Sequence, residues 1–159
     1  MNPSKNIGSL LQHLSFSLGR QTDQVLLEQL GIGYSQFKIL EVLFGDKDVR
    51  QKHIADILGQ TEASISRQIK LMQRDGFVTR VINRRNRREH LSTLTVKGEI
   101  VYEESLKILN NYHSPVYESL SSRQQRILHE ALGKMHLEVC AGNKPGRCYP
   151  SFFERPIDE

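Results

Sequence analysis

The segment from Gly76 to Arg88 carries a cluster of arginines with no acidic residue among them. The members of the cluster are Arg80, Arg84, Arg85, Arg87 and Arg88. Guanidinium groups at this density repel one another in the free protein. Binding to a polyanion relieves this repulsion. It is also favourable because each cation that neutralises a phosphate releases condensed counterions. The cluster therefore predicts contact with a nucleic-acid backbone.

A second basic group precedes this cluster, on a segment with the pattern of an amphipathic helix. Thr61 is suited to cap that helix, which is expected to end near Arg74. With Ile65, Ile69 and Met72 buried, a rotation of about 100° per residue leaves an outward face that is basic and otherwise small. Such a face suits entry into a DNA major groove, although an ordinary solvated helix face carries similar charges. The side chains expected to contact DNA are Thr61, Ala63, Ser64, Ser66, Arg67, Lys70 and Arg74.

Three further helices are expected on the N-terminal side of this segment. Apolar residues recur at spacings of three, four and seven over residues 5–30, which predicts an amphipathic helix. Ser35 is suited to cap a second helix that stops at Gly45. Asp48 and Gln51 have the spacing of a capping box for a short third helix. That helix and the basic one, separated by LGQT, have the spacing of a helix-turn-helix.

The basic cluster itself lies between two β-rich stretches. FVTRVI and HLSTLT predict two strands joined by NRRNRR. Thr95 is suited to cap a long helix toward Leu120, which Pro115 should kink or interrupt because its ring lacks an N–H donor. A capping box at Ser121 or Ser122 predicts a last helix to about Cys140.

These elements predict a mainly α fold with a small β-hairpin wing. Residues 1–140 are expected to form a single domain, with a winged helix-turn-helix over 34–96 and flanking helices over 5–30 and 96–140. An irregular, proline-rich tail is expected over 141–159.

Composition excludes several classes of protein. Apolar residues make up 38% of the 159-residue chain and charged residues 25%, which is typical of a soluble globular protein. No segment approaches the roughly 18 apolar residues of a membrane span, and the N-terminus lacks the apolar core of a secretory signal. Two cysteines are too few for a disulfide framework, which fits a reducing compartment. We therefore expect a cytoplasmic protein without a membrane partner.

The chain resembles the multiple antibiotic resistance regulator (MarR) family of bacterial winged-helix transcription factors over residues 5–140. The resemblance is most specific in LGQTEASISRQIKLMQRDGFVTR and in NRREHLSTLTVKG. The family's wing signature has an aspartate, any residue, an arginine and five further residues before Leu-Thr. The matching residues here are Asn86, Arg88 and Leu94–Thr95, followed by a family-like Lys97–Gly98. Asn86 lacks the charge that would hold the wing arginines, so a less fixed and more positive wing is expected.

The resemblance implies a sequence-specific transcriptional regulator of the repressor type that binds a pseudo-palindromic operator in double-stranded DNA as a homodimer. The first helix and the last two helices of each subunit would interlock. Independently, those helices carry more apolar surface than a small winged-helix core could cover, which indicates an interface. The resemblance implies that Arg88, supported by Arg87, reaches toward the minor groove. The basic cluster adds Arg84 and Arg85 as candidate wing residues.

Family members commonly bind small phenolic or aromatic effectors, which release the DNA. Each aromatic residue that could line such a pocket could equally be a plain core residue. The candidates are His13, Phe16, Phe37, Phe44 and Tyr112.

Other readings of the sequence stay open. Some relatives sense oxidants through cysteine, and Cys140 and Cys148 are the thiols available for a redox role. A DNA-coating architectural protein would use the same basic surfaces without a preferred site. His129, His136 and Cys140 could share one helix face, but no second cluster completes a tetrahedral metal site. We expect no metal, no cofactor and no catalytic residue, because no nucleophile, nucleotide-binding or acid–base motif is present.

Overall fold

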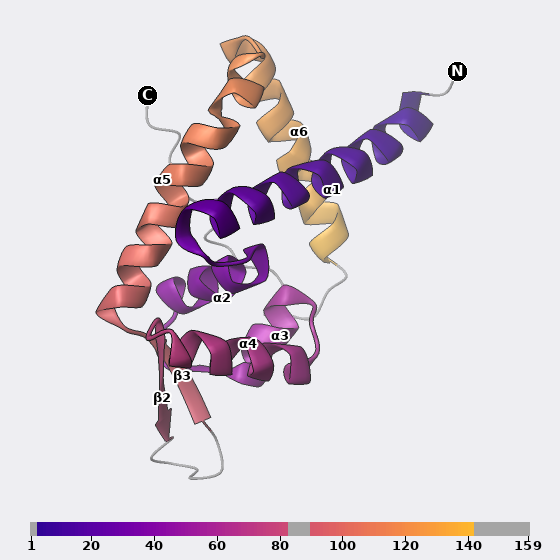
Figure 1. The fold of residues 1–159 in the computed structure, drawn as a ribbon. Coiled ribbons are helices and arrows are strands. Elements are labelled where there is room, and N and C mark those ends of the chain that lie inside the picture. Colours follow the sequence, from indigo (N-terminus) through magenta and orange to yellow (C-terminus); the bar gives the residue numbers. More distant parts are fainter. Residues whose placement is uncertain (1–2, 83–89, 142–159) are drawn as a thin grey trace.

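A computed structural model of the chain describes residues 3–82 and 90–141 (Figure 1). No helix in these two ranges is long and apolar enough to cross a membrane. The elements, in chain order, are α1 (Pro3–Leu30), α2 (Tyr34–Gly45), β1 (Val49–Arg50), α3 (Gln51–Leu58), α4 (Glu62–Arg74), β2 (Val78–Ile82), β3 (His90–Leu94), α5 (Val96–Glu118) and α6 (Ser122–Ala141). The predicted fold class, mainly α with a β-hairpin, is confirmed.

The strands form a three-stranded antiparallel sheet in the order β1-β3-β2. In the central strand β3, Ser92 lies opposite Val49 of β1 and opposite Arg80 of β2. Helices α2, α3 and α4 pack against this sheet and against one another. We refer to residues 34–95 as the lobe. The sequence predicted the β2–β3 hairpin but not β1, which is only two residues long.

The core of the lobe extends onto two of the long helices. Ile65 and Ile69 of α4 are fully buried, as are Leu26 of α1 and Tyr102 of α5. The ring of Tyr102 stacks on that of Phe37, with 6.0 Å between centroids. Burial of a large apolar side chain contributes roughly 1.5 to 3 kcal/mol. This cluster therefore fixes the C-terminal half of α1 and the N-terminal half of α5 to the lobe.

A polar contact joins α1 to α5 beyond this core. The Oγ1 atom of the buried Thr22 lies 3.0 Å from Nε2 of His113. His113 Nδ1 is also buried, and it has no hydrogen-bond partner among the described residues. Burial lowers the pKa of His113 below its ordinary value of 6.5, because the charged imidazolium loses hydration there. The contact between α1 and α5 therefore favours the neutral form of the His113 imidazole.

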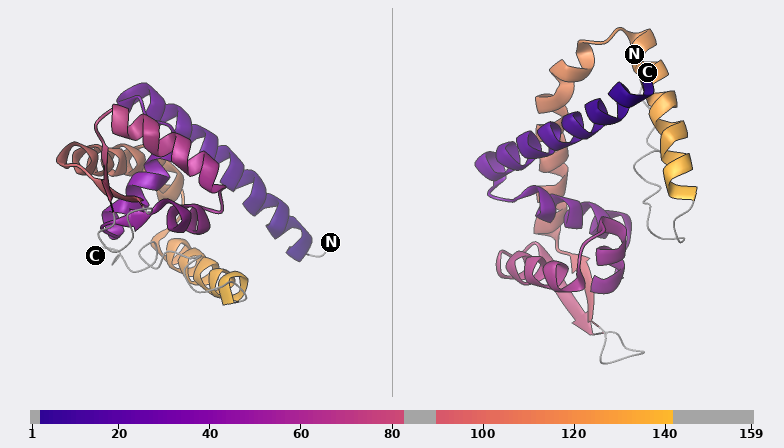
Figure 2. Two further views of the ribbon diagram at one scale, coloured as in Figure 1. Left: turned by 90° about the horizontal axis from the view of Figure 1, so that it is seen from below. Right: turned by 90° about the vertical axis from the view of Figure 1, so that its right-hand side faces the viewer.

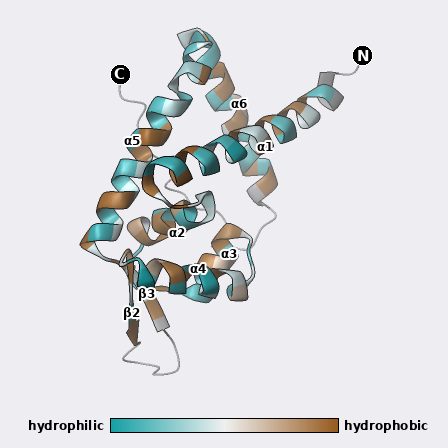
Figure 3. Ribbon diagram, viewed as in Figure 1, coloured by the Kyte–Doolittle hydropathy of each residue, from teal (hydrophilic) through white to brown (hydrophobic). Residues whose placement is uncertain are grey.

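The N-terminal half of α1 and the whole of α6 extend beyond the lobe (Figures 1 and 2). α6 makes no extensive contact with any other element that the structure describes. Hydrophobic residues nevertheless recur along α6 (Figure 3). The large exposed hydrophobic side chains of the two segments are Ile7, Leu10, Leu14, Phe16, Ile127, Leu128, Leu132, Met135, Leu137 and Val139.

The cap predicted for the second helix is wrong. α2 begins at Tyr34, after an N-cap at Gly33, so Ser35 lies inside its first turn. The Gly33 N–H donates to Oε1 of Gln36 at 3.0 Å, and the Tyr34 N–H donates to Oδ1 of Asp23 at 2.7 Å. Because α1 supplies one of these acceptors, the start of α2 depends on a contact between two helices.

The capping box predicted for the third helix is also wrong. α3 begins at Gln51 after an N-cap at Arg50, and Asp48 adopts a left-handed backbone with φ of 59°. Between them, Val49 and Arg50 are extended because they pair with β3. This pairing separates the Asp48 side chain from the helix that it was expected to cap.

The later boundaries agree more closely with the sequence. The predicted caps at Thr95 and Ser121 are confirmed, since Thr95 Oγ1 accepts from the Gly98 N–H at 3.0 Å and Ser121 forms a capping box with Gln124. A kink or an interruption was expected at Pro115, and the interruption does not occur, since α5 continues through Pro115 to Glu118.

Candidate DNA-binding surface

Helix α4 is fixed by a cap at its first turn and by a fully apolar inner side. Thr61 Oγ1 accepts a hydrogen bond from the Ser64 N–H at 3.2 Å. Ile65, Ile69 and Met72 are each 0% exposed. The predicted cap and the predicted buried face of this helix are therefore confirmed. Residues one half-turn away from the buried face must point out of the lobe.

The outward face of α4 holds most of the side chains expected to contact DNA. Thr61, Ala63, Arg67, Lys70 and Arg74 are exposed, whereas Ser64 and Ser66 are half-buried. The Ser64 hydroxyl donates to Oε1 of Gln60 at 3.3 Å, and Nε of Arg74 lies 3.1 Å from Oδ1 of Asp75. Arg67 and Lys70 therefore form the cationic centre of this face.

Leu71 changes the expected character of the same face. Its side chain is 40% exposed, and a rotation of about 100° per residue places it about 40° around the helix from Arg67. The expectation that the outward face is basic and otherwise small is wrong at this position. An exposed branched aliphatic group can contact the C5-methyl group of thymine. The helical wheel of the sequence already contained this signal.

The β2–β3 hairpin lies beside α4 and projects from the rest of the lobe (Figure 1). Val78 is buried at the base of β2, whereas the four residues that follow it in the strand are exposed. Arg80, the first member of the arginine cluster, is one of them. The other candidate wing residues lie outside the described residues, and so does Asn86. They are Arg84, Arg85, Arg87 and Arg88.

Comparison with known proteins relates these helices and the hairpin to one protein family. The model of the MarR family matches residues 30–89, which span α2 to the hairpin. Residues 30–89 form a MarR-family domain. Relatives that match the chain are named as HTH-type transcriptional regulators.

Similarity to other regulators extends beyond the MarR-family domain. An uncharacterized HTH-type transcriptional regulator of Bacillus cereus is 24% identical over 134 residues, which cover 82% of this chain and 89% of the relative. The HTH-type transcriptional regulator BilQ of Clostridium symbiosum is 26% identical over 85 residues, covering 54% of this chain and 59% of the relative.

Solved structures share the fold over most of the chain. A MarR transcriptional regulator from Methanosarcina mazei superposes with a TM-score of 0.76 at 24% identity, covering 86% of this chain and 98% of the other. Wild-type MarR from E. coli in its apo form gives a TM-score of 0.73 at 21% identity, covering 80% of this chain and 95% of the other. The flanking helices therefore belong to the same fold as the MarR-family domain.

The candidate effector residues are spread over several parts of the chain. Phe37 is buried in the core, and Phe44 is exposed with its ring 4.6 Å from that of Tyr102. Tyr112 is exposed on α5. His13 and Phe16 line two different hollows on α1. Each of these two hollows is lined by one of the five candidates, and the role of all five stays a prediction.

The hollow beside Phe16 lies between α1 and the start of α2 and has a volume of about 670 Å³. The Arg20 guanidinium lies 5.9 Å from the centre of the Phe16 ring, and Asp23 and Tyr34 also line the hollow. Burial raises the pKa of Tyr34, and the nearby charge of Glu41 raises it further. The Tyr34 phenol therefore stays protonated and able to donate a hydrogen bond.

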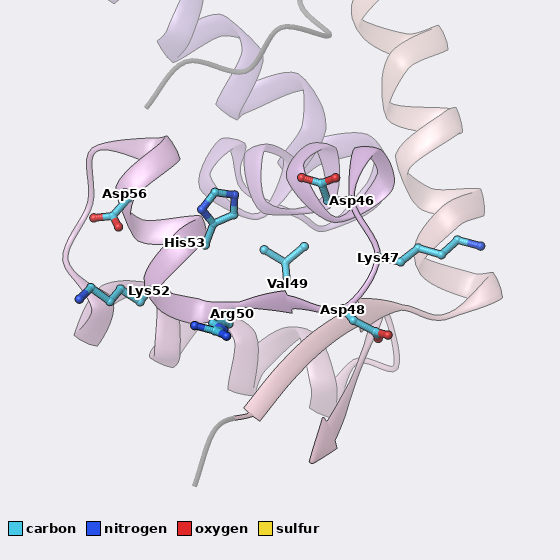
Figure 4. Close-up of a pocket in the computed structure, with 8 residues that line it drawn as sticks. All are labelled: Asp46, Lys47, Asp48, Val49, Arg50, Lys52, His53 and Asp56. Atoms are coloured by element: carbon cyan, nitrogen blue, oxygen red, sulfur yellow. The ribbon is translucent and has the colours of Figure 1, made fainter. Parts of the chain in front are cut away.

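A third hollow, of about 520 Å³, lies on the lobe where α2, β1 and α3 meet (Figure 4). Val49 projects between Asp46 and His53, while Lys47 and Lys52 point away on opposite sides (Figure 4). Because aspartates and cations alternate along its wall, this hollow is a poor site for a polyanion. We therefore leave it out of the DNA-binding surface.

The remaining candidates concern thiols and metals. Cys140 lies in the last turn of α6, but its side chain and the whole of Cys148 are outside the described residues. His129 and His136 lie on the same helix. In the part of the chain that the structure describes, no group of three or more His, Cys, Asp or Glu residues is placed to hold a metal ion.

Proposed function

We propose that the protein is a cytoplasmic, sequence-specific repressor that binds a pseudo-palindromic operator as a homodimer and leaves it when a small aromatic effector binds. The observation that carries this proposal is the outward face of α4, where Arg67 and Lys70 are exposed beside the hairpin. Arginine can bond two acceptors of guanine at once in the major groove, and a basic loop beside it can follow the backbone or the minor groove.

The homodimer is supported by the apolar side chains that one chain leaves exposed. On α6, Leu128, Leu132 and Met135 lie three and four positions apart and are all exposed. Exposed apolar side chains that recur at helical spacing mark an interface. In a twofold dimer the same face meets its own copy, and the two recognition helices would lie about 34 Å apart, one turn of DNA.

The effector is supported by the chemistry of the hollow beside Phe16. Its wall combines aromatic and aliphatic groups with the Arg20 guanidinium and with the Asp23 carboxylate, which already accepts the Tyr34 N–H. A flat aromatic ring that carries a carboxylate or phenolate would satisfy the apolar groups and the guanidinium. Because α1 and α2 both contribute to the wall, an occupant there would contact a dimerisation helix and the lobe at once.

Selection of bound duplexes tests the central claim. Fragments retained from a genomic or random-sequence pool define the preferred site, and its dissociation constant is then compared with that of shuffled DNA at one stated salt concentration. We expect a ratio of about 1000 or more. A ratio near one would contradict sequence-specific binding and would favour the architectural alternative.

Arg67→Ala sharpens the test. The loss of a guanidinium that contacts a base weakens binding to the selected site by about tenfold, and weakens binding to shuffled DNA less. Arg126→Ala removes the same charge from the exposed surface of α6 and is the matched control. Equal losses on both duplexes for Arg67→Ala would mean that this side chain contacts only phosphates.

A further inference from the structure

The C-terminal end of the recognition helix α4 finishes in a Schellman motif. The Phe77 N–H donates to the Met72 carbonyl at 2.9 Å, and the Gly76 N–H donates to the Gln73 carbonyl at 3.1 Å. Gly76 has the positive φ, 79°, that this motif requires. The motif leaves the carbonyls of three consecutive residues, 75 to 77, available to accept hydrogen bonds from outside the helix.

The start of α5 supplies a donor to each of these carbonyls. The Thr95 N–H donates to Phe77 O at 3.0 Å, and the Thr95 hydroxyl donates to Gly76 O at 2.7 Å. The Lys97 ammonium donates to Asp75 O at 2.8 Å and lies 4.9 Å from the centre of the Phe77 ring. We call residues 75–77 together with 95–98 the helix junction.

The two backbones of the helix junction touch at Gly98. A Cβ atom on Gly98 would lie 2.1 Å from the Phe77 carbonyl oxygen, well inside van der Waals contact. At the same time, the Gly98 N–H donates to the Thr95 hydroxyl, which is itself bonded to the end of α4. One hydroxyl therefore caps α5 and ties it to α4, with no space left between the two backbones.

Longer side-chain hydrogen bonds hold the other end of α4. There, the Ser64 hydroxyl donates to Gln60 at 3.3 Å, and the Gln60 amide donates to the Ser35 hydroxyl of α2 at 3.4 Å. These distances are at the long end of the range for such bonds, whereas those of the helix junction are near the ordinary values. Of these hydrogen bonds, those of the helix junction are the shorter.

We propose that the helix junction sets the direction of α4 relative to the dimerisation helices, and that Lys97 is a positioning residue for DNA binding. Lys97 acts by holding the C-terminal end of the recognition helix, not by neutralising a phosphate. This inference rests on the proposed homodimer and its two half-sites. Because α5 joins the lobe to the dimerisation surface, the angle at the junction determines how far apart the two recognition helices lie.

Half-site spacing provides a readout that an ordinary loss of stability would not change. The probe is the tightest-binding duplex from the selection, prepared at its native spacing and with one or two base pairs inserted between half-sites. For the unmodified protein, a one-base-pair insertion should weaken binding by about tenfold or more. For Lys97→Met, binding at native spacing should be about fivefold weaker, while the insertion should cost less than about threefold, because α4 can now tilt.

Two further variants complete the experiment. Lys97→Arg should restore the dependence on spacing, because a guanidinium can also donate to a carbonyl and lie over an aromatic ring. Lys107→Met makes the same charge change on the exposed surface of the same helix and should behave as the unmodified protein.

The outcomes separate the alternatives. If Lys97→Met keeps the full spacing penalty and instead lowers the salt dependence of binding, Lys97 is a phosphate contact and the inference is overturned. If the unmodified protein itself tolerates every insertion, the two-half-site mode of the proposed function fails, and the inference fails with it.

Discussion

The lobe and α6 both carry many hydrophobic side chains, but in opposite environments. In the lobe, residues such as Ile54, Ile65 and Ile69 are fully buried by neighbours from the same chain. On α6, residues such as Leu128 and Leu132 are more than two-fifths exposed, with no described element packed extensively against them. The lobe is complete in one chain, whereas α6 has no extensive partner surface among the described residues.

This difference indicates which properties should depend on protein concentration. A core closed within one chain contributes the same stability at every concentration, whereas a surface that needs a second copy contributes only when copies associate. The same distinction divides α1, whose Leu26 is buried against the lobe while Leu10, further toward the N-terminus, is exposed.

The largest effect is expected in the core of the lobe. Ile69→Ala removes buried carbons from the inner face of α4 and should lower the free energy of unfolding by about 3 kcal/mol. Urea denaturation at several protein concentrations measures this loss, which should be the same at each. Lys70→Ala, on the outward face of the same helix, should change it by less than about 0.5 kcal/mol. A loss that grows with dilution would show that the lobe is not complete in one chain.

The next effect concerns the proposed partner surface. The double change Leu132→Glu and Met135→Glu places carboxylates on the exposed apolar face of α6. It should raise the dimer dissociation constant at least about 100-fold, because the association would bury unpaired charges. Sedimentation equilibrium measures the constant, and the lobe should keep its own unfolding transition.

Lys134→Glu is the matched control on α6, because that position is already polar and exposed. It should alter association far less than the double change. If both variants dimerise like the unmodified protein, another surface must hold the two copies together.

A smaller effect is expected from the candidate wing. Replacing Arg87 and Arg88 by alanine should weaken binding to the selected duplex by roughly tenfold. It should also reduce the slope of log affinity against log salt by about one for each phosphate that is no longer neutralised. Replacing Arg123 and Arg126 of α6 removes the same charge away from the lobe and should leave the slope unchanged. An unchanged slope in the wing variant would mean that those two arginines do not touch DNA.

The smallest effect is expected at the contact between α1 and α5. Because burial lowers the pKa of His113, the unfolded chain binds a proton more readily than the folded protein. The stability that His113 contributes is therefore present above its ordinary pKa of 6.5 and is lost as the pH falls below that value.

His113→Gln removes the titration and keeps a group that can hydrogen-bond to Thr22. Melting temperatures at pH 5.5 and 7.5 should differ less in this variant than in the unmodified protein. His129→Gln replaces an exposed histidine on α6 and should retain the full difference. If all three proteins lose the same amount, His113 does not make the fold sensitive to acid.

Sequence reasoning succeeded where a signal and its partner lie within one helical turn. Thr61 and Thr95 each accept a backbone N–H three positions ahead, so residue type and spacing were sufficient to predict both caps. The buried stripe of α4 was predictable for the same reason. Its three apolar residues recur with the helical period, and the lobe buries all of them.

Sequence reasoning failed where the partner is distant in the chain. α2 begins one residue before the predicted cap at Ser35, because Asp23 of α1 binds the Tyr34 N–H. Asp48 does not cap α3, because Val49 and Arg50 pair with a strand about forty residues away. Periodicity also cannot distinguish a stripe covered by the same chain from one left exposed, as on α6.

The candidate site shows the same limit. The basic face of α4 was predictable, but Lys97 was noticed only as part of a motif, since its acceptor is a backbone carbonyl 22 residues earlier. No property of the lysine itself indicates such a bond. The match between Gly98 and the Phe77 carbonyl is likewise visible only in three dimensions.

The helix junction also closes the base of the β2–β3 hairpin, since the bond from Thr95 N–H to Phe77 O joins the two ends of that segment. Changes of sequence or length between the strands therefore need not displace either helix. The sequence between β2 and β3 can therefore be exchanged as a unit. Segments from related regulators could be exchanged there to alter the proposed wing contacts with DNA, while the proposed major-groove contacts of α4 stay as they are.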